Sequence, residues 1–434
     1  MVERLARGGI ALAIAGAIAC HSGASTAPEA DADVRVTYQR DIRPLMETHC
    51  TSCHHEGGIG PFPLTTFEQV RLHGQRVVDA VIERIMPPAQ TRPECRPVIE
   101  QRWLSDADRA LFREWADEGF PEGSPDSYEA PPPPAPADGT EDLGPHDITA
   151  RMPEPYPFME DFQGDAYDVV ALDHTFEETT YVTATEVVPG DTRLLHHAGI
   201  LVADSTGSFP ELSEEEQEQA SQGFLELPSI GGYFPGSAFF RLPSDAAFVV
   251  PAGSQLFLEV HYHLSNWPYP DPPQEDDTYV RLWTLEAGQV PAMRAETMAL
   301  MNTDLHIEAG DANAVETAVG TLGTEPFTIT AVTPHMHLFG KRAQMNVIRE
   351  DGTRECVIST PNFDFDWQAT HRFATPHQVR VAAEDLGEVT CIYDNSQENQ
   401  PVVGGTQLRP EDVYYGVSSL DEMCVMYMVV TRPF

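Results

Sequence analysis

Two stretches of the chain decide the fold of its larger part: LFLEVHYH at residues 256–263 and FTITAVTPHMH at residues 327–337. In the first, Leu256, Leu258 and Val260 occupy alternate positions, and the second alternates in the same way over its first six residues. A period of two is typical of a β-strand, whose successive side chains point to opposite faces. Both stretches end in two histidines at positions i and i+2, which a strand places on one face. The sequence therefore predicts an all-β region that carries histidine clusters.

The composition limits the fold and the partners of the whole chain. Its 434 residues are enough for about three domains of ~150 residues, and 41% of them are hydrophobic, which is enough for real cores. Lys and Arg total 26 against 68 Asp and Glu, a formal net charge of −42. Such a charge opposes binding to nucleic acid and to anionic lipid surfaces. The 37 Pro and 31 Gly residues indicate many loops and linkers.

The N-terminus has the pattern of an export signal. Two arginines precede an apolar run at residues 8–19, which is too short to span a bilayer, and Cys20 follows Ala-Ile-Ala. This pattern is similar to a bacterial lipobox. It predicts a signal peptide at residues 1–20, a lipid anchor on Cys20, and a place in the periplasm or cell envelope. An ordinary secretory signal cut nearby is the alternative. Residues 21–35 would be a tether, and export permits disulfides.

A proline-rich segment at residues 123–149 divides the rest of the chain. We expect an extended linker between a first module, residues 36–122, and a second module, residues 150–434. At ~3.1 Å per residue, its central stretch of about 22 residues would reach ~68 Å. A tether of this length would let the first module visit the second and would raise their effective concentration.

The first module is predicted to carry haem, because it contains CTSCH at residues 50–54. The thiols of Cys50 and Cys53 can form thioethers to the haem vinyl groups, and His54 can ligate the iron. A redox disulfide and half of a zinc site are the alternatives. However, no strand leads into the motif as in thioredoxin, and no second Cys or His pair has zinc spacing. The motif therefore predicts one covalently bound haem c.

The sixth iron ligand is predicted to be Met86. A helical pattern at residues 67–85, with an apolar face from Val77 to Ile85, ends where two prolines follow this methionine. A thioether ligand raises the haem potential and suits electron transfer. Met46 is a rival ligand, and a core position for Met86 is the other interpretation.

A last helix is predicted to begin at a capping box of Ser105 and Asp108 and to stop at Gly119. Together with the CTSCH motif and the methionine before two prolines, this helix resembles a class I cytochrome c. The resemblance covers residues 36–122 and implies a small all-α haem domain. An external electron donor would reduce this haem.

Metal chemistry in the second module is indicated by three histidine clusters, each expected to follow a strand: His196-His197, His261-Tyr262-His263 and His335-Met336-His337. Adjacent histidines point apart on a flat strand, so joint ligation by the first cluster needs a bend or a bulge. Imidazole ligands with a thioether, for which Met423 is the candidate, favour copper. The spacing alone leaves one copper ion, two copper ions or zinc open.

Three motifs are similar to those of a known family: LEVHYH at residues 258–263, HMHLFGKR at residues 335–342 and LDEMCV at residues 420–425. In order and separation they resemble the type II copper, ascorbate-dependent monooxygenases, which include dopamine β-hydroxylase and peptidylglycine α-hydroxylating monooxygenase. The resemblance covers residues 150–434. It implies two all-β, jelly-roll-type sandwich domains, residues 150–295 and residues 296–434, with one copper ion on each.

The resemblance also implies which side chains bind the metals. The electron-storing copper would be bound by His196, His197 and His261. The oxygen-activating copper would be bound by His335, His337 and Met423. His263 matches a family position that is not a ligand, and Cys391 and Cys424 match a disulfide beside the methionine ligand.

The predicted function is that of a copper-dependent monooxygenase. It would hydroxylate a C–H bond of a small organic substrate with O2, receive electrons through the fused haem, and pass the second electron across a cleft between the coppers. Where the peptide-hydroxylating enzyme has an arginine for its substrate's carboxylate, this chain has Thr333, and Tyr427 matches a substrate-side tyrosine. The alternatives are a non-catalytic haem and copper protein and a structural sandwich with a haem tag. Cys95 and Cys356 have no predicted role.

Overall fold

A computed structural model describes residues 35–56, 58–99, 101–131, 143–158, 165–192, 194–204, 228–235, 239–263, 275–403 and 406–434. The predicted signal peptide with Cys20, the predicted tether up to residue 34 and the centre of the proline-rich linker lie outside the described residues. The chain divides into two compact units, Met1–Arg35 and Val36–Phe434, and the description below concerns the second. No helix of the described part is both long and apolar enough to cross a membrane.

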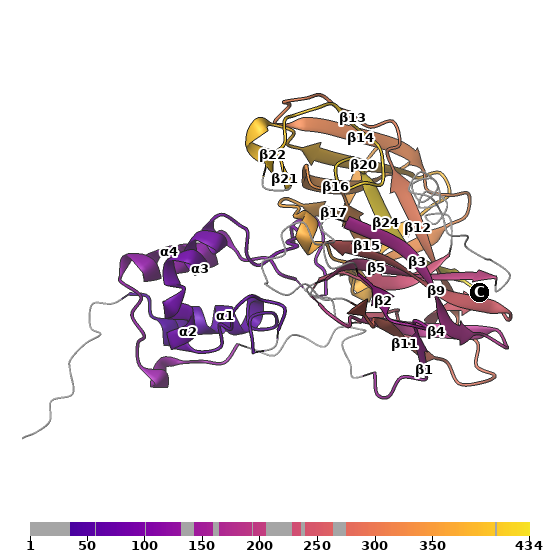
Figure 1. The fold of residues 1–434 in the computed structure, drawn as a ribbon, viewed down its shortest axis with the longest axis horizontal. Helices are drawn as coiled ribbons and strands as arrows, with labels where there is room; N and C mark the ends of the chain where they lie inside the picture. The colour runs from indigo at the N-terminus through magenta and orange to yellow at the C-terminus, as the bar shows by residue number, and fades with distance from the viewer. Residues whose placement is uncertain are drawn as a thin grey trace, which may run out of the picture. The chain divides into compact units, whose positions relative to one another are not determined.

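Four helices lie in the N-terminal part of this unit (Figure 1). Their bounds are Arg43–His49 for α1, Phe67–Leu72 for α2, Gly74–Ile82 for α3 and Asp106–Asp117 for α4, with a π-helical turn η1 at Tyr38–Ile42 and a 3-10 turn η2 at Pro125–Ser127. Their shared core contains Met46, Val70, Phe112 and Trp115, all of which are fully buried. Met46, the rival iron ligand, is therefore part of the apolar core.

The predicted boundaries of the last helix are confirmed by α4. Ser105 Oγ accepts a hydrogen bond from the Asp108 backbone N–H at 3.1 Å, and the Asp108 carboxylate accepts one from the Ser105 N–H at 2.9 Å. This reciprocal pair satisfies two N–H groups that the first helical turn leaves without partners. Gly119 follows the C-cap with φ of +81°, a conformation that glycine adopts without steric cost.

The single helix predicted over residues 67–85 is wrong, because the structure has α2 and α3 in its place. Gly74 begins α3 where the ring of Phe120 packs so closely that a Cβ would lie 3.1 Å from it. Val77, Val78 and Val81 are buried as predicted, but Ile85 lies beyond the helix and is 50% exposed. Arg84, with φ of +63°, turns the chain out of the helical direction before the last predicted turn.

A ten-stranded sheet organises the β region, in the order β1-β11-β4-β8-β12-β24-β15-β18, with β7 paired to β4 and β19 paired to β15. The bounds are Ile148–Arg151 for β1, Tyr279–Thr284 for β11, Thr180–Val188 for β4, Ala246–Val250 for β8, Met293–Met301 for β12, Val425–Pro433 for β24, Phe327–His335 for β15, His371–Arg372 for β18, Phe240–Arg241 for β7 and Val379–Val381 for β19. Strands β8 and β12 pair in parallel and join the two halves of this sheet.

Two four-stranded sheets complete the β region: β3-β9-β5-β6 and β14-β20-β16-β17. Their bounds are Asp165–Thr175 for β3, Ser254–His263 for β9, Leu195–Asp204 for β5, Ser229–Tyr233 for β6, Ala314–Thr321 for β14, Leu386–Tyr393 for β20, Gly340–Ile348 for β16 and Arg354–Thr360 for β17. Smaller pairs are β2 Tyr156–Pro157 with β10 Glu275–Asp276, β13 His306–Ile307 with β23 Val413–Tyr414, and β21 Val402–Val403 with β22 Thr406–Gln407. The 3-10 turns are η3 Phe365–Trp367, η4 Thr375–His377 and η5 Gln397–Asn399.

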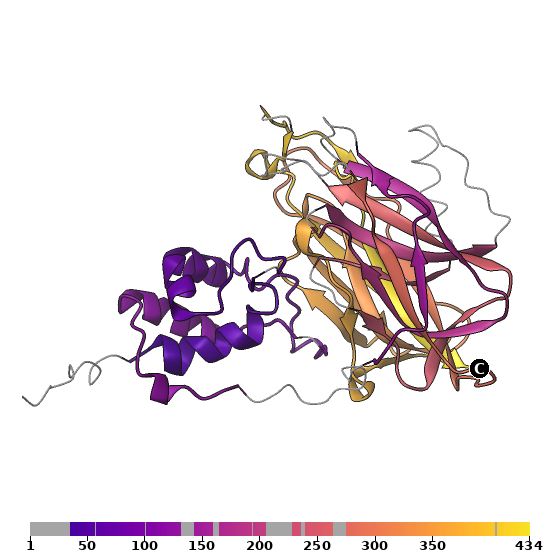
Figure 2. The same ribbon diagram turned by 60° about the horizontal axis from the view of Figure 1, so that its bottom comes forward.

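These sheets stack as two β-sandwiches, in agreement with the predicted all-β architecture (Figure 2). Leu256, Leu258 and Val260 of β9 point into the first core, as the alternation in the sequence predicts, while Phe257 and His261 on the opposite face are buried as well. The second core lies between β15, β24 and the β14-β20-β16-β17 sheet. Ala331 of β15 and Val429 of β24 pack in the first core, because the large sheet runs through both sandwiches.

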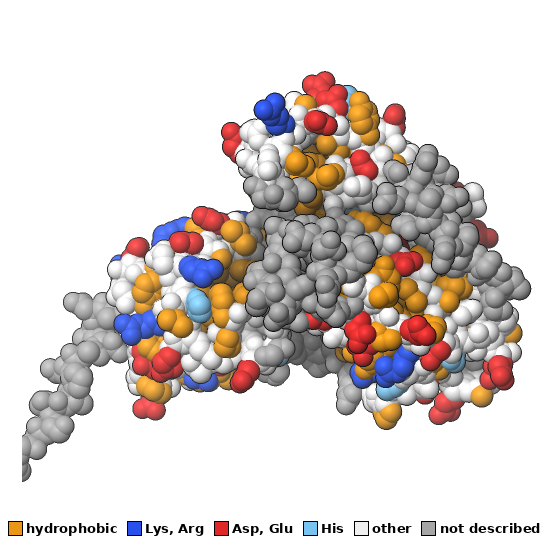
Figure 3. Space-filling view, viewed as in Figure 1, with side chains coloured by type: hydrophobic (Ala, Val, Ile, Leu, Met, Phe, Trp, Pro, Cys, Tyr) orange, Lys and Arg blue, Asp and Glu red, His pale blue; other side chains and the backbone are white. Residues whose placement is uncertain are grey.

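Two disulfides cross-link the described chain. Cys391 and Cys424 are bonded as predicted. Cys95 is bonded to Cys356, 261 residues away, so the two cysteines without a predicted role are partners. Acidic side chains are spread over the visible face of the molecule, in keeping with the net charge of −42 (Figure 3).

Candidate metal centres

The first histidine cluster is formed by β5 and β9. His196 and His197 begin β5 and do not follow a strand, contrary to expectation. The pairing of β5 with β9 shifts register between Leu195 and His197, which is the irregularity that joint ligation requires. His261 pairs with His197 across the two strands. The bulge therefore lets adjacent histidines face one point.

The geometry of this cluster fits a bound cation. The Nδ1 atom of His196 lies 3.1 Å from that of His197 and 3.2 Å from that of His261, and the last two Nδ1 atoms are 3.3 Å apart. Three ring nitrogens this close cannot all carry protons, so lone pairs converge. Burial, followed by the charge of the neighbouring histidines, holds the pKa of His197 well below its usual range. Neutral imidazoles are the form that binds metal.

The second predicted donor set lies where β15 meets the segment before β24. His335 ends β15, and its Nδ1 lies 2.7 Å from Gln368 Oε1. The Nδ1 of His337 lies 3.2 Å from the backbone carbonyl of Asp421. Both partners accept hydrogen bonds, so each Nδ1 carries the proton and each Nε2 lone pair is left for a metal. Burial lowers the pKa of His335 to about 4.

Glu422 joins the segments that supply these donors, a role that the sequence did not reveal. Its fully buried carboxylate accepts hydrogen bonds from the backbone N–H groups of His337 at 2.8 Å, Phe339 at 2.8 Å and Met423 at 3.1 Å. Burial raises its pKa to about 8 in spite of these donors. One side chain therefore fixes the backbone of two predicted ligands from separate parts of the chain.

The two donor sets lie next to each other. The ring centroids of His197 and His335 are 5.6 Å apart. Phe365 stacks on His196 at 4.4 Å and lies 6.1 Å from the ring of His337. The bulge that turns His197 toward β15 brings the sets together, because β5 and β15 belong to facing sandwiches.

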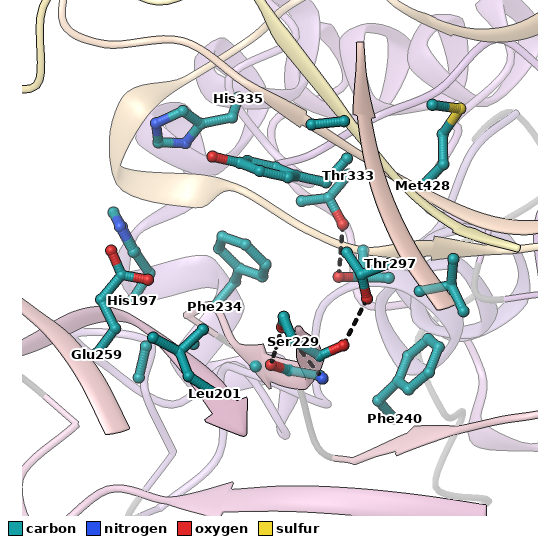
Figure 4. A pocket seen from close by; sticks show the side chains of 18 of the residues that line it. His197, Leu201, Ser229, Phe234, Phe240, Glu259, Thr297, Thr333, His335 and Met428 are labelled. Atoms are coloured by element: carbon teal, nitrogen blue, oxygen red, sulfur yellow. Dashed lines mark hydrogen bonds between the residues drawn. The ribbon is translucent and has the colours of Figure 1, made fainter. Parts of the chain in front are cut away.

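One histidine of the first set and all three donors of the second set line one pocket with a volume of about 190 Å³. His197, His335, His337 and Met423 all line it. Figure 4 shows His197 and His335 with Phe234 and Phe240, which form part of its wall. The pocket is thus a place where a small apolar molecule could lie beside both sets of donors.

Polar and apolar side chains both line this pocket. Thr333 and Tyr427 line it as the family resemblance implied, and Thr333 Oγ1 lies 2.8 Å from Thr370 Oγ1. Glu259 is the one carboxylate among the described lining residues, and none of them is Lys or Arg. Burial raises the pKa of Glu259 to about 7. The described lining residues therefore offer no Lys or Arg to pair with a substrate carboxylate.

The CTSCH segment fits covalent haem. Cys50 and Cys53 are free thiols, so the alternative of a disulfide between them is not formed. His54 is buried, and its Nδ1 lies 3.0 Å from the Phe62 backbone carbonyl, which orients Nε2 for iron. Gly60 packs against this ring, where a Cβ would lie 2.6 Å from Nδ1. Met86, partly buried beyond α3, stays a predicted ligand.

Comparison with known families supports the metal chemistry of the C-terminal half. Residues 295–431 match the family model of the copper type II ascorbate-dependent monooxygenase, C-terminal domain. This confirms the resemblance for a stretch that includes His335, His337, Met423 and the Cys391–Cys424 disulfide. No curated protein matches the chain.

Solved structures show only distant likenesses. The STIV MCP shares 8% identity at a TM-score of 0.27, over 65% of this chain and 95% of that one. PNGase F, a glycosylasparaginase from Flavobacterium meningosepticum, shares 6% identity at a TM-score of 0.30, and the match covers 66% of this chain and 96% of that one. The infectious bursal disease virus VP2 subviral particle shares 11% identity at a TM-score of 0.17, and the match covers 68% of this chain and 81% of that one. At these TM-scores the likenesses carry no argument about function.

Proposed function

We propose that the chain is an exported copper-dependent monooxygenase that hydroxylates a C–H bond of a small organic substrate with O2. The observation that carries this proposal is that side chains from two donor sets of different chemistry line one pocket. Three imidazoles form one set, and two imidazoles with a methionine form the other. The family match over residues 295–431 supports copper in the second set.

Copper ions bound at these side chains would supply one-electron redox chemistry and the activation of O2. The reaction takes RH, O2, two electrons and two protons to ROH and H2O, so two one-electron centres match its stoichiometry. The thioether of Met423 is a soft ligand that favours Cu(I), the state that reacts with O2. The three imidazoles of His196, His197 and His261 suit both copper states and would store the second electron.

The chain's own residues position the reactants. Gln368 and the Asp421 carbonyl hold the tautomers of His335 and His337, and Glu422 holds the backbone of His337 and Met423. The apolar wall of the pocket excludes water from the C–H bond. The lack of Lys and Arg among the described lining residues favours a neutral or cationic substrate over a carboxylate.

Electrons would enter through a c-type haem on residues 36–122, with Met86 as the proposed sixth ligand. The support is the buried His54, whose Nδ1 is occupied by the Phe62 carbonyl, beside two free thiols at haem spacing. Haem carries one electron at a time, as each copper does. The location in the cell envelope and the lipid anchor on Cys20 belong to this proposal and rest on the N-terminal sequence.

The test is O2 uptake by the reduced, copper-loaded protein over a panel of small neutral, cationic and anionic substrates. We expect O2 to be consumed in equal amounts with hydroxylated product, and only when a substrate is present. His335→Ala should abolish uptake, whereas His306→Ala, at an exposed histidine of the same sandwich, should not. Copper binding without uptake on any substrate would favour the alternative, a non-catalytic electron-transfer or copper-binding protein.

A further inference from the structure

Residues 90–99, named here the strap, follow the predicted haem ligand Met86 and precede α4. The sequence places the strap inside the first module, yet Val98 is buried in the core of the C-terminal sandwich. Backbone hydrogen bonds join Arg92 N to Ser359 O and Ile99 N to Arg372 O, each at 2.9 Å. The strap thus lies on the second sandwich.

Arg96 is the main polar contact of the strap. Its Nη1 donates to His377 O at 2.7 Å, its Nη2 to Glu355 Oε1 at 2.6 Å and to Cys356 O at 3.0 Å, and its Nε to Cys356 O at 3.3 Å. The side chain is only 12% exposed. A planar guanidinium that donates four hydrogen bonds fixes the position of the strap on the sandwich and also stabilises the contact.

The Cys95–Cys356 disulfide adds a covalent bond at the centre of these contacts. It closes a loop of 261 residues, so it holds together parts of the chain that the linear sequence leaves far apart. The disulfide and the predicted linker therefore both connect the modules. While the disulfide is formed, the helical module cannot move freely over the full reach of the linker, contrary to what the sequence suggested.

The strap also contacts the helical module. Arg109 of α4 donates to Val81 O at 3.0 Å and to Gln90 Oε1 at 2.9 Å. Gln90, which is buried, donates to Pro87 O at 2.6 Å. In addition, Asn362 of the sandwich donates to Arg84 O, just before Met86, at 3.2 Å.

We propose that the strap is a docking element that fixes the predicted haem-binding helices on the C-terminal sandwich, so that electrons would pass to bound copper within a locked unit. The second half of this inference rests on the proposed function. Each transfer would move one electron from Fe(II) haem to Cu(II), leaving Fe(III) and Cu(I), and an external one-electron donor would reduce the haem again. Transfer would not depend on a search by the tethered module.

The docking is tested in the full-length holoprotein with a specific protease site inserted at residues 132–142. After cleavage, a gel without reductant should show one species of full mass, and a gel with reductant should show two fragments. Two fragments without reductant would overturn the docking. This result does not depend on copper, haem or turnover.

The non-covalent contacts are tested in a background with both Cys95→Ser and Cys356→Ser. After linker cleavage, gel filtration should show that Arg96→Ala releases the fragments at a protein concentration at which Arg92→Ala does not. Arg92 is the matched control, because its side chain is exposed and its contact to Ser359 is made by the backbone. Equal behaviour of the two variants would contradict the role of Arg96.

Electron transfer is measured by stopped-flow oxidation of reduced haem in copper-loaded protein, before and after linker cleavage. The rate should be the same in both samples and independent of protein concentration. A fall after cleavage of more than tenfold would overturn the locked unit. Linked fragments without any transfer would instead show that the docking stands and that the haem-fed function is wrong.

Discussion

At the scale of single residues, Glu422 links the fold to the proposed chemistry. A fully buried carboxylate is costly unless its oxygens are satisfied, and backbone N–H groups from two segments do this. Those segments carry His337 and Met423. The position of both predicted ligands therefore depends on one side chain that itself binds no metal.

Glu422→Gln should weaken copper binding at the His335, His337 and Met423 set by roughly 10- to 100-fold, the usual cost of losing an outer-shell partner. The amide offers one acceptor atom and places an NH2 group against a backbone N–H. Competition titration with a Cu(I) chelator measures the affinity.

The matched control for this experiment is Glu388→Gln. The Glu388 carboxylate in β20 accepts hydrogen bonds from Asn346 and Arg354 and has no hydrogen bond to the predicted metal ligands. The three-histidine site should bind copper normally in both variants. Equal affinities for Glu422→Gln and wild type would show that the carboxylate does not position the ligands.

Met423→Leu should keep the fold, because the two side chains have similar volume. The variant should lose the sulfur shell in the X-ray absorption spectrum of reduced copper, and turnover should drop roughly 10-fold or more. Met428→Leu, at a second buried methionine of the same pocket, should leave both unchanged. A sulfur shell that survives in Met423→Leu would show that this thioether is core packing.

At the scale of elements, the strands and their site could be predicted, and the helices only in part. Alternation in β9 and β15 and the need for a bulge at His196 follow from the two-residue repeat of a strand, which is a local property. The helix breaks at His73, and the next residue, Gly74, packs against Phe120, which is distant in sequence. No local pattern contains such a contact.

Contacts between distant parts of the sequence also explain which site residues could not be predicted. Glu422 stands in the LDEMCV motif, but two of its backbone partners are His337 and Phe339. Gln368 has no periodicity around it, and only the fold brings it to His335. The Cys95–Cys356 pairing spans 261 residues, so neither cysteine could be assigned from spacing.

Strand β18 supplies a test of pH dependence through His371. Burial, and then the charge of Arg102, lowers the pKa of this histidine to about 3. Between pH 6.5 and about 3 the unfolded chain takes up a proton that the folded chain excludes. The contribution of His371 to the free energy of unfolding therefore falls as the pH is lowered through this window.

His371→Gln should remove that contribution. Urea unfolding of metal-free protein at pH 7 and pH 5 should show a smaller loss of stability on acidification in the variant than in the wild type. The comparison isolates His371, since all other groups are shared. An equal or larger loss in the variant would show that this histidine titrates normally in the folded chain.

At the scale of the whole molecule, two connections join the helical module to the sandwiches: the linear chain and the Cys95–Cys356 bond within the strap. The proposed activity divides in the same way, with electron entry on the helices and chemistry between the sandwiches. The sequence indicated this division but not the strap. The ring centroids of His197 and His335 are 5.6 Å apart, so the two proposed sets of copper ligands are neighbours.

Replacing both Cys50 and Cys53 with Ala should separate these two activities. The variant should lose haem and haem-driven hydroxylation, while its copper content and its turnover with a small-molecule reductant stay at wild-type levels. Absorbance of the haem bands and product formation with each donor give the result. Normal haem-driven turnover in the variant would place electron entry elsewhere.

The central claim is that two neighbouring donor sets hold two copper ions, and the most direct test is the copper-to-protein ratio of the copper-saturated full chain. Elemental analysis should give two copper ions per wild-type chain and one per His335→Ala chain. A wild-type ratio of one or less, the loss of both ions in His335→Ala, or retention of zinc in the presence of excess copper would contradict the claim.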